Sequence, residues 1–265
     1  MVQLEAHRGV SLRYPESTMA AFRAAAREGY KMIELDPKVT RDGEIVILHD
    51  MTINRTARKD GQAPAQPLPV SDLTLDELRT YEYGSWKSPK FTGEPLVTLR
   101  EVLDFSREVG IALKFDNVMQ KFPSSAPDDF CRAVTDAGFV GERQAQIGLT
   151  GSRIDYLAGM HARLPGAHLH YDGPFPVGTE ADAVLDALHA LVPPEQLTVW
   201  LPAYRISWCG VEPADAYRVA AIRRVGTCGL WIINAREQIA PALSLGADWI
   251  ETDGTMTVED VTGLV

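Results

Sequence analysis

Residues 2–36 read VQLEAHRGVSLRYPESTMAAFRAAAREGYKMIELD, and this stretch predicts a strand, a helix and a second strand in succession. The strands are expected at residues 2–7 and 31–36. Between them, Ser17 or Thr18 is the predicted cap of a helix that runs to Glu28 and stops at Gly29. A strand, a helix and a strand in this order form the unit of a parallel α/β sheet.

The same unit repeats along the rest of the chain, with strand-like and helix-like segments in alternation. Eight strands with intervening helices, in a chain near the typical size of about 250 residues, predict a (β/α)8 TIM barrel. The later strands are expected at residues 111–116, 144–149, 167–171, 197–201, 229–233 and 248–252. The later helices are expected near residues 98–109, 126–138, 152–163, 180–191, 213–225 and 235–245.

One segment departs from the alternation. Residues 44–49 also resemble a strand, but no helix fits between them and Asp36, and Asp42-Gly43 is a hairpin turn signal. We therefore expect a β-hairpin over residues 34–49 that extends strand 2 and places His49 roughly opposite Asp36.

Residues 50–97 then form a small insertion after strand 2. It is rich in Pro and Gly and has one short helix with a capping box of Thr74 and Glu77. A long excursion in a compact domain is usually functional. We expect it to cover the barrel mouth, where Tyr83 and Trp86 would form apolar walls.

Composition limits the class of protein. The 265 residues suit a single domain over residues 1–265, and 45% hydrophobic with 23% charged residues is a normal globular mixture. The formal net charge of −10 argues against partners such as nucleic acid or anionic membranes. A small molecule is the expected partner, and the oligomeric state stays open.

Location is predicted from what the sequence lacks. The three cysteines form no CxxC pair, the first residues do not resemble a signal peptide, and no apolar run reaches the length of a membrane span. These features predict a cytoplasmic protein, although a secreted chain without its leader would look the same.

Charged side chains gather where the predicted barrel strands end, which is where barrel enzymes place their active sites. Glu34 and Asp36 are two residues apart on one strand, so they share a face. Two adjacent carboxylates repel each other unless a proton or a cation lies between them, and such oxygen ligands suit Mg²⁺ or Ca²⁺. The others at these ends are His7, Arg8, His49, Lys114 and Asp116.

His7 and His49 are the candidates for general acid and general base, because imidazole titrates near neutral pH. The sequence leaves open which histidine has which role. Arg8 could hold phosphate oxygens with its planar guanidinium, although a salt bridge at the rim would explain it equally well.

The opening residues 6–57 closely resemble those of glycerophosphodiester phosphodiesterases. Further similar segments are VSDLTLDELRTYEYG at 70–84, LVTLREVLDF at 96–105, LWIIN at 230–234 and GADWIETD at 246–253. The resemblance implies a barrel with a divalent metal, a place in lipid metabolism, and hydrolysis of glycerophosphodiesters to sn-glycerol 3-phosphate and an alcohol. It implies His7 and His49 as the acid–base pair, Glu34 and Asp36 as metal ligands, Arg8 as a phosphate contact and Trp231 as an aromatic beside the substrate.

Other motifs depart from the family. The family's ExK motif, which supplies a third metal ligand, is replaced by ALKFDNV at 112–118, and we expect Asp116 to be that ligand and Lys114 to face the phosphate. HLHYDG at 168–173 places His170 where it could line the pocket. Two alternatives stay open: a phosphodiester lyase that forms a cyclic phosphate, and a barrel that only binds a phosphorylated ligand.

Overall fold

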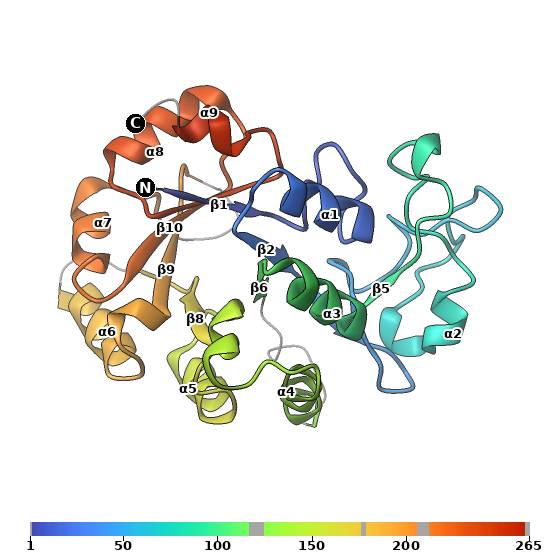
Figure 1. The fold of residues 1–265 in the computed structure, drawn as a ribbon, viewed down its shortest axis with the longest axis horizontal. Helices are drawn as coiled ribbons and strands as arrows, with labels where there is room; N and C mark the ends of the chain where they lie inside the picture. Colours follow the sequence, from blue (N-terminus) through green and yellow to red (C-terminus); the bar gives the residue numbers. More distant parts are fainter. Residues whose placement is uncertain (1, 117–124, 176–178, 206–211, 263–265) are drawn as a thin grey trace.

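Eight parallel strands close into a barrel, and the helices form a ring around it (Figure 1). This computed structural model describes residues 2–116, 125–175, 179–205 and 212–262. The strand order around the barrel is β1-β11-β10-β9-β8-β7-β6-β2, so the first and last strands are neighbours. The predicted (β/α)8 fold, with a hairpin and an insertion after the second barrel strand, is confirmed.

The element boundaries follow the sequence pattern with local shifts. Residues 144–146 lie in a 3-10 turn rather than a strand, and the structure has one more helix than the sequence pattern predicts, α9 Val258–Thr262. The barrel strands are β1 Gln3–Ala6, β2 Met32–Leu35, β6 Ala112–Phe115, β7 Ile147–Gly151, β8 His168–Tyr171, β9 Leu197–Pro202, β10 Thr227–Trp231 and β11 Trp249–Thr252. The helices are α1 Met19–Arg27, α2 Leu75–Leu78, α3 Leu99–Val109, α4 Ala126–Asp136, α5 Ile154–Arg163, α6 Thr179–His189, α7 Ala216–Ile222, α8 Ile239–Ser244 and α9 Val258–Thr262.

The first turn of the chain shows why the local sequence suits this geometry. Thr18 caps α1 by accepting a hydrogen bond from the backbone of Ala21. Gly9 has a φ of +80°, and a Cβ there would lie 2.7 Å from the Cβ of Ala21. Only glycine lets β1 turn this closely against α1, which directs His7 and Arg8 to the barrel mouth.

The inside of the barrel is unusually polar. Outward side chains such as Leu4, Ile33 and Leu113 join the main hydrophobic core with the helices. Inward positions instead carry charged side chains. Glu5 lies beside Glu251 on the neighbouring strand, Glu34 lies beside Lys114, and Lys114 forms ion pairs with Glu5 and Glu251. Barrel interiors are usually filled with branched apolar residues, so this one holds ion pairs where packing is expected.

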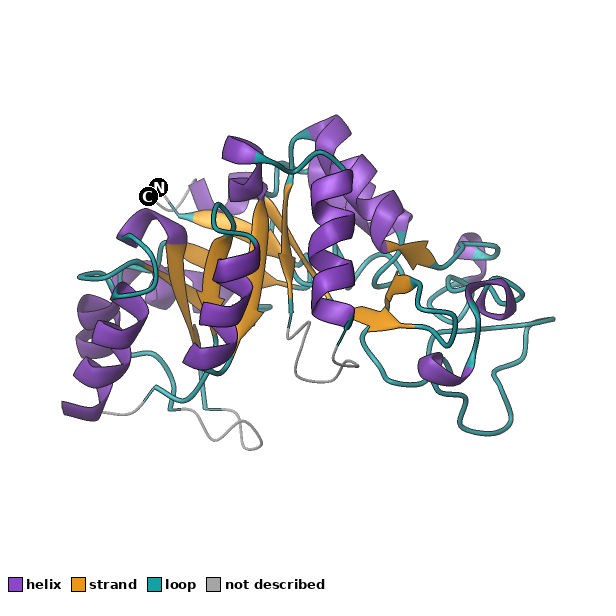
Figure 2. Cartoon of the chain, turned by 90° about the horizontal axis from the view of Figure 1, so that it is seen from below, coloured by secondary structure: helices purple, strands orange, loops and turns teal. Residues whose placement is uncertain are grey.

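The hairpin and the insertion form a second unit beside the barrel (Figure 2). Strands β3 Pro37–Val39, β4 Ile45–Ile47 and β5 Val97–Thr98 form an antiparallel sheet. The backbone of Leu48 donates to the carbonyl of Asp36, so His49 lies one residue from the predicted position opposite Asp36. The insertion has its own hydrophobic core, made of Val46, Leu48, Ile53, Ala57, Val70, Leu78, Tyr83 and Leu96.

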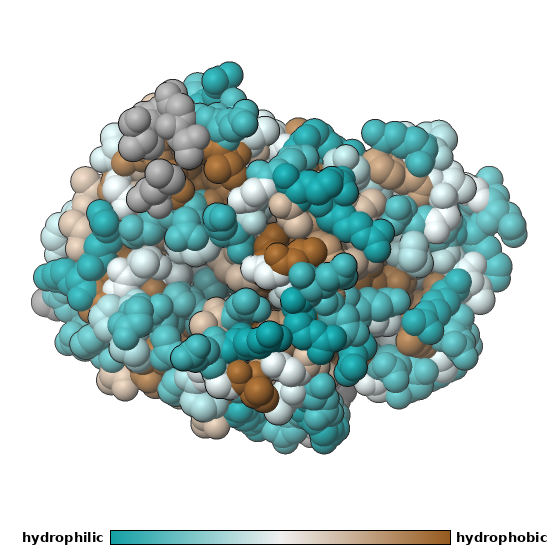
Figure 3. Space-filling view, in the orientation of Figure 1, coloured by the Kyte–Doolittle hydropathy of each residue, from teal (hydrophilic) through white to brown (hydrophobic). Residues whose placement is uncertain are grey.

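Figure 3 shows a face that is mostly hydrophilic, with small apolar patches scattered over it. In the part of the chain that the structure describes, no helix is both long and apolar enough to cross a membrane. The cytoplasmic location stays a prediction.

Mild acid is expected to destabilise the barrel through His168 on β8. Burial lowers the pKa of His168 to about 4, whereas the unfolded chain takes up that proton near pH 6.5. The free energy of unfolding should therefore fall by roughly 2 kcal/mol as the pH drops from about 6.5 to about 4. Each unit of pKa difference corresponds to about 1.4 kcal/mol, and we expect less than the full product because the ring is partly exposed. Chemical denaturation at several pH values measures this effect.

The His168→Gln variant should lose the part of that pH dependence that His168 causes, while burial also lowers the pKa of His170, which keeps its own share. Exposed His189 provides the matched control. If His168→Gln and His189→Gln show the same acid sensitivity as the natural chain, burial of His168 is not its cause.

Candidate active site

A cavity of about 680 Å³ opens at the carboxyl ends of the barrel strands. Most of the side chains predicted for the site lie on its wall, together with several that the sequence pattern did not single out. The described lining residues are His7, Arg8, Glu34, Asp36, His49, Lys114, Asp116, Thr150, Asp172, Trp200, Trp231, Ile232 and Glu251.

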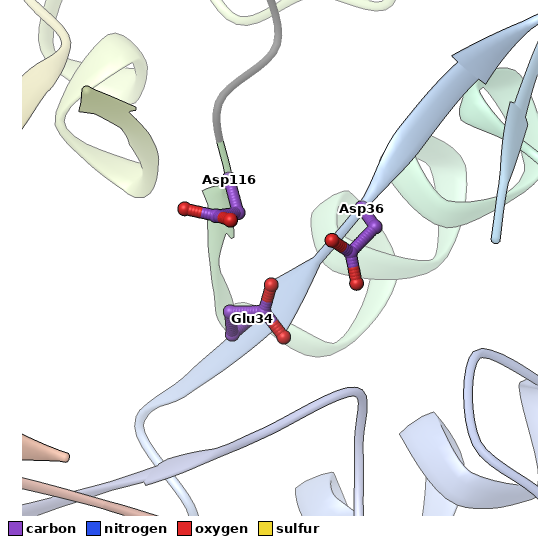
Figure 4. A group of neighbouring side chains, drawn as sticks. All are labelled: Glu34, Asp36 and Asp116. Atoms are coloured by element: carbon purple, nitrogen blue, oxygen red, sulfur yellow. The ribbon is translucent and has the colours of Figure 1, made fainter. Parts of the chain in front are cut away.

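Three carboxylates meet on one side of this cavity (Figure 4). Glu34 comes from β2, Asp36 follows that strand, and Asp116 follows β6. Each offers an oxygen within 4.8 Å of the others. Burial, followed by the charges of Asp36, Asp116 and Glu251, raises the pKa of Glu34 well above its ordinary value. Oxygens gathered in this way fit a hard divalent cation, which would offset their mutual repulsion.

The first predicted histidine is held by an aspartate that directly follows the last barrel strand, β11. His7 follows β1, and its Nδ1 lies 2.6 Å from Oδ1 of Asp253. Ser11 and Asn234 also donate to Asp253. Burial raises the pKa of Asp253, but these hydrogen bonds, led by that from His7, outweigh burial and hold it below its usual value.

The other nitrogen of His7 faces the carboxylates. Its Nε2 lies 4.0 Å from Glu34 and 3.9 Å from Glu251. Because Asp253 accepts from Nδ1, Nε2 is the atom that can exchange a proton in the cavity.

The second predicted histidine has a similar arrangement on the hairpin. The Nδ1 atom of His49 lies 2.7 Å from Oδ1 of Asp50, so its Nε2 is also the nitrogen left for the cavity. The His49 side chain is 42% exposed, compared with 14% for His7. The imidazole of His7 thus reaches the cavity from the end of a barrel strand, and that of His49 reaches the same cavity from the hairpin outside the barrel.

Arg8 contacts three carboxylates in and beside the cavity. Its backbone, at a φ of +55°, donates to Glu34. Its guanidinium donates to Glu16 at 3.2 Å and lies 3.5 Å from Asp36. Arg8 lines the cavity while its charge is shared with two carboxylates.

Lys114 lies on the cavity floor in a cluster that the sequence pattern did not predict. Its Nζ lies 2.5 Å from Glu5 and 2.8 Å from Glu251, and 3.9 Å from the ring centroid of Trp200. Burial alone would lower the pKa of Lys114, but Glu251 and Glu5 raise it above its ordinary value. Lys114 therefore stays charged, with most of its charge compensated by the protein.

Two aromatic predictions have different outcomes in the structure. Trp231, at the end of β10, lines the cavity, and its contact with substrate stays a prediction. His170 is buried, its Nδ1 accepts a hydrogen bond from Trp200, and its ring lies against Gly148, where a Cβ would be 2.5 Å from Nε2. His170 is absent from the described cavity wall, and we correct its assignment to a buried partner of Trp200.

The insertion also differs from the expectation. Tyr83 is buried in the insertion's own core, and its hydroxyl donates to the carbonyl of Leu78. The indole of Trp86 donates to the carbonyl of Tyr83. Among the described residues that line the cavity, none belongs to the insertion of residues 50–97. Tyr83 and Trp86 instead make their hydrogen bonds within the insertion.

Some missed residues left a signal in the sequence. Glu5 lies two residues before His7 and shares its face of the strand. Glu251 lies near the end of the last barrel strand and Asp253 directly follows it, positions where charged residues are typical of barrel active sites. No local pattern connects Glu16 or Arg55 to the site, since their partners lie on other segments.

The chain is similar to known proteins of one family. Residues 7–172 match the model of the glycerophosphoryl diester phosphodiesterase family. A glycerophosphodiester phosphodiesterase of Bacillus altitudinis is 40% identical over 260 residues, which cover 96% of this chain and 95% of that protein. A glycerophosphodiester phosphodiesterase of Caldanaerobacter subterraneus subsp. tengcongensis is 41% identical over 99 residues, which cover 37% of this chain and 38% of that protein. Several other curated relatives are matched over about two fifths of their length.

Solved structures share the fold at low sequence identity. An Oleispira antarctica phosphodiesterase in complex with the product sn-glycerol-3-phosphate has a TM-score of 0.74 and 20% identity, over 99% of this chain and 96% of that one. A glycerophosphodiester phosphodiesterase from Agrobacterium tumefaciens has a TM-score of 0.68 and 18% identity, over the full length of both.

Proposed function

This chain belongs to the glycerophosphoryl diester phosphodiesterase family, and we propose that it hydrolyses glycerophosphodiester-like substrates to sn-glycerol 3-phosphate and an alcohol. The proposal rests on the observation that His7, His49 and the three carboxylates line the same cavity. The product in the Oleispira antarctica complex supports sn-glycerol 3-phosphate as the phosphomonoester.

We assign the cation site to Glu34, Asp36 and Asp116, with Mg²⁺ or Ca²⁺ as the ion. The donor set is entirely oxygen, which suits these hard cations better than zinc. When bound, the cation neutralises negative charge that develops on the phosphate in the transition state. Arg8 and Lys114 add positive charge to the same region, Lys114 less strongly because Glu5 and Glu251 compensate it.

His7 and His49 form the proposed acid–base pair. One Nε2 accepts the proton of the attacking water, and the other donates a proton to the leaving alkoxide. Asp253 and Asp50 hold the two rings by their Nδ1 atoms, so that both Nε2 atoms face the substrate. Trp231 provides an aromatic surface for the alcohol portion.

We propose that residues 1–265 work as one catalytic domain, with the insertion beside the barrel mouth. Its separate hydrophobic core supports a rigid unit, and the contacts of Arg55 with Glu16 and Asp50 connect it to the site. The insertion would then affect catalysis through these contacts.

The test is product analysis by phosphorus NMR. Chelator-treated protein is supplied with glycerophosphodiesters that differ in their alcohol, with and without Mg²⁺ or Ca²⁺. We expect metal-dependent release of sn-glycerol 3-phosphate. A cyclic phosphate as the final product would show a lyase, and no turnover of any diester, including bis(p-nitrophenyl) phosphate, would show a barrel that only binds.

A further inference from the structure

We propose that Arg55, which comes from the insertion, is a positioning residue for His49. It acts through Asp50 by fixing the carboxylate that orients the imidazole. The inference rests on the proposed acid–base role of His49, and Arg55 itself is not among the described residues that line the cavity. This role of Arg55 gives the insertion a function in catalysis, although none of the insertion's described residues lines the cavity.

The guanidinium of Arg55 joins two carboxylates from different segments. Towards Asp50, its Nε donates at 2.7 Å to Oδ2 and its Nη2 at 3.1 Å to Oδ1. Towards Glu16, its Nη1 and Nη2 each donate at 2.7 Å. All three nitrogens are used in two paired contacts, a geometry that the planar guanidinium favours and a lysine ammonium cannot reproduce.

Both ends of this bridge are anchored. Glu16 belongs to the loop between β1 and α1, its side chain is 11% exposed, and Arg8 also donates to it. Arg55 itself lies close to Trp86, since its guanidinium is 5.7 Å from the ring centroid of Trp86. Burial raises the pKa of Asp50, but hydrogen bonds from Arg55 and His49 outweigh burial and lower it to about 2. Asp50 thus remains an anion that accepts from both neighbours.

His49 needs such support more than His7 does. It lies beyond the end of β4 on the hairpin, and its side chain is 42% exposed, so core packing fixes its ring less. Asp50 is its neighbour in the chain, and its side chain is 29% exposed, so several rotamers are open to it. By holding both oxygens of Asp50, Arg55 selects the rotamer that accepts from Nδ1 and directs Nε2 to the cavity.

The kinetic test is a double-mutant cycle with Arg55→Gln and His49→Ala. Arg55→Gln alone is expected to lower kcat about 10-fold or more with KM within about 2-fold, because a small displacement of a reacting group is costly. In the His49→Ala background the same change should have no further effect on kcat. An equal loss in both backgrounds would overturn the proposal, since Arg55 would then act independently of His49.

Two further variants separate positioning from folding. Arg58→Gln is the matched control, since Arg58 is in the same segment but donates to the backbone carbonyls of Asn54, Arg55 and Ala57. Arg55→Lys keeps the charge and should fold even if Arg55→Gln does not, yet it should show the same loss of kcat. Natural kcat in a folded Arg55→Lys variant, or an equal loss in Arg58→Gln, would contradict the proposal.

A readout without activity keeps this inference separate from the proposed function. Long-range ¹H–¹⁵N spectra of the imidazoles, assigned by comparison with His49→Ala, should show His49 with the Nδ1 proton held in the natural chain. Arg55→Gln or Arg55→Lys should give a mixture of tautomers at His49. An unchanged spectrum would refute the role of Arg55 even if the enzyme proves to be a diesterase, and failure of the diesterase assay alone would leave this result standing.

Discussion

Replacing His7 or His49 by alanine is expected to lower turnover of an unactivated glycerophosphodiester about 100-fold or more. Positioned acid–base groups contribute roughly 10²–10⁴ to the rate, and each imidazole is oriented by a carboxylate on its Nδ1. The measurement is kcat with saturating cation, on variants whose fold is confirmed by circular dichroism.

The leaving group identifies which histidine is the acid. A p-nitrophenolate leaves with little protonation, so the variant that lacks the general acid should lose less activity on bis(p-nitrophenyl) phosphate than on a natural diester. The exposed His189 gives a matched control, since His189→Ala removes an imidazole remote from the barrel mouth. Near-natural turnover of an unactivated diester by either site variant would remove that histidine from the mechanism.

Removing one carboxylate of the cluster should nearly abolish catalysis and yet stabilise the protein without metal. Asp36→Asn or Glu34→Gln takes one charge from carboxylates that lie within 4.8 Å of one another. We expect turnover to fall about 100-fold or more, because the cation's charge stabilisation contributes several kcal/mol to the transition state. The same variants should raise Tm in chelator and lose most of the rise in Tm that Mg²⁺ gives the natural chain.

The prediction for Asp116 is more specific, because it concerns binding of the cation alone. Asp116→Asn should weaken Mn²⁺ binding, measured by electron paramagnetic resonance. Crystals soaked in Mn²⁺ should show an anomalous peak with an Asp116 oxygen in its inner shell, direct or through one water. A peak between Glu34 and Asp36 without such an oxygen would show that Asp116 is no ligand.

The two sets of variants are independent tests. We expect the histidine variants to lose activity but bind Mn²⁺ normally, and the carboxylate variants to lose both activity and Mn²⁺ binding. This result would support histidines as the acid–base pair and carboxylates as the metal ligands. A histidine variant that also loses Mn²⁺ would indicate that the imidazole orders the cation site as well.

The barrel, the hairpin and half of the site follow from the amino-acid sequence alone. Alternation of strands and helices is a local property, and so is the rule that active-site residues follow the carboxyl ends of strands. Local patterns are therefore enough to place His7, Glu34 and Asp36 at one mouth of the barrel. The DG turn likewise predicts the hairpin to within one residue of the pairing that is observed.

The partners of these residues depend on the folded chain. Lys114 and Glu251 are 137 residues apart, and His7 and Asp253 are 246 apart, so no periodicity relates them. His170 was predicted to line the pocket because side chains alternate along a strand, but alternation does not tell how deep in the barrel a residue lies. The depth depends on the closure of the barrel and on neighbours such as Trp200 and Gly148, which reach His170 from other strands. The spacing of residues along one segment determines which way their side chains point, whereas contacts between segments depend on how the whole chain packs.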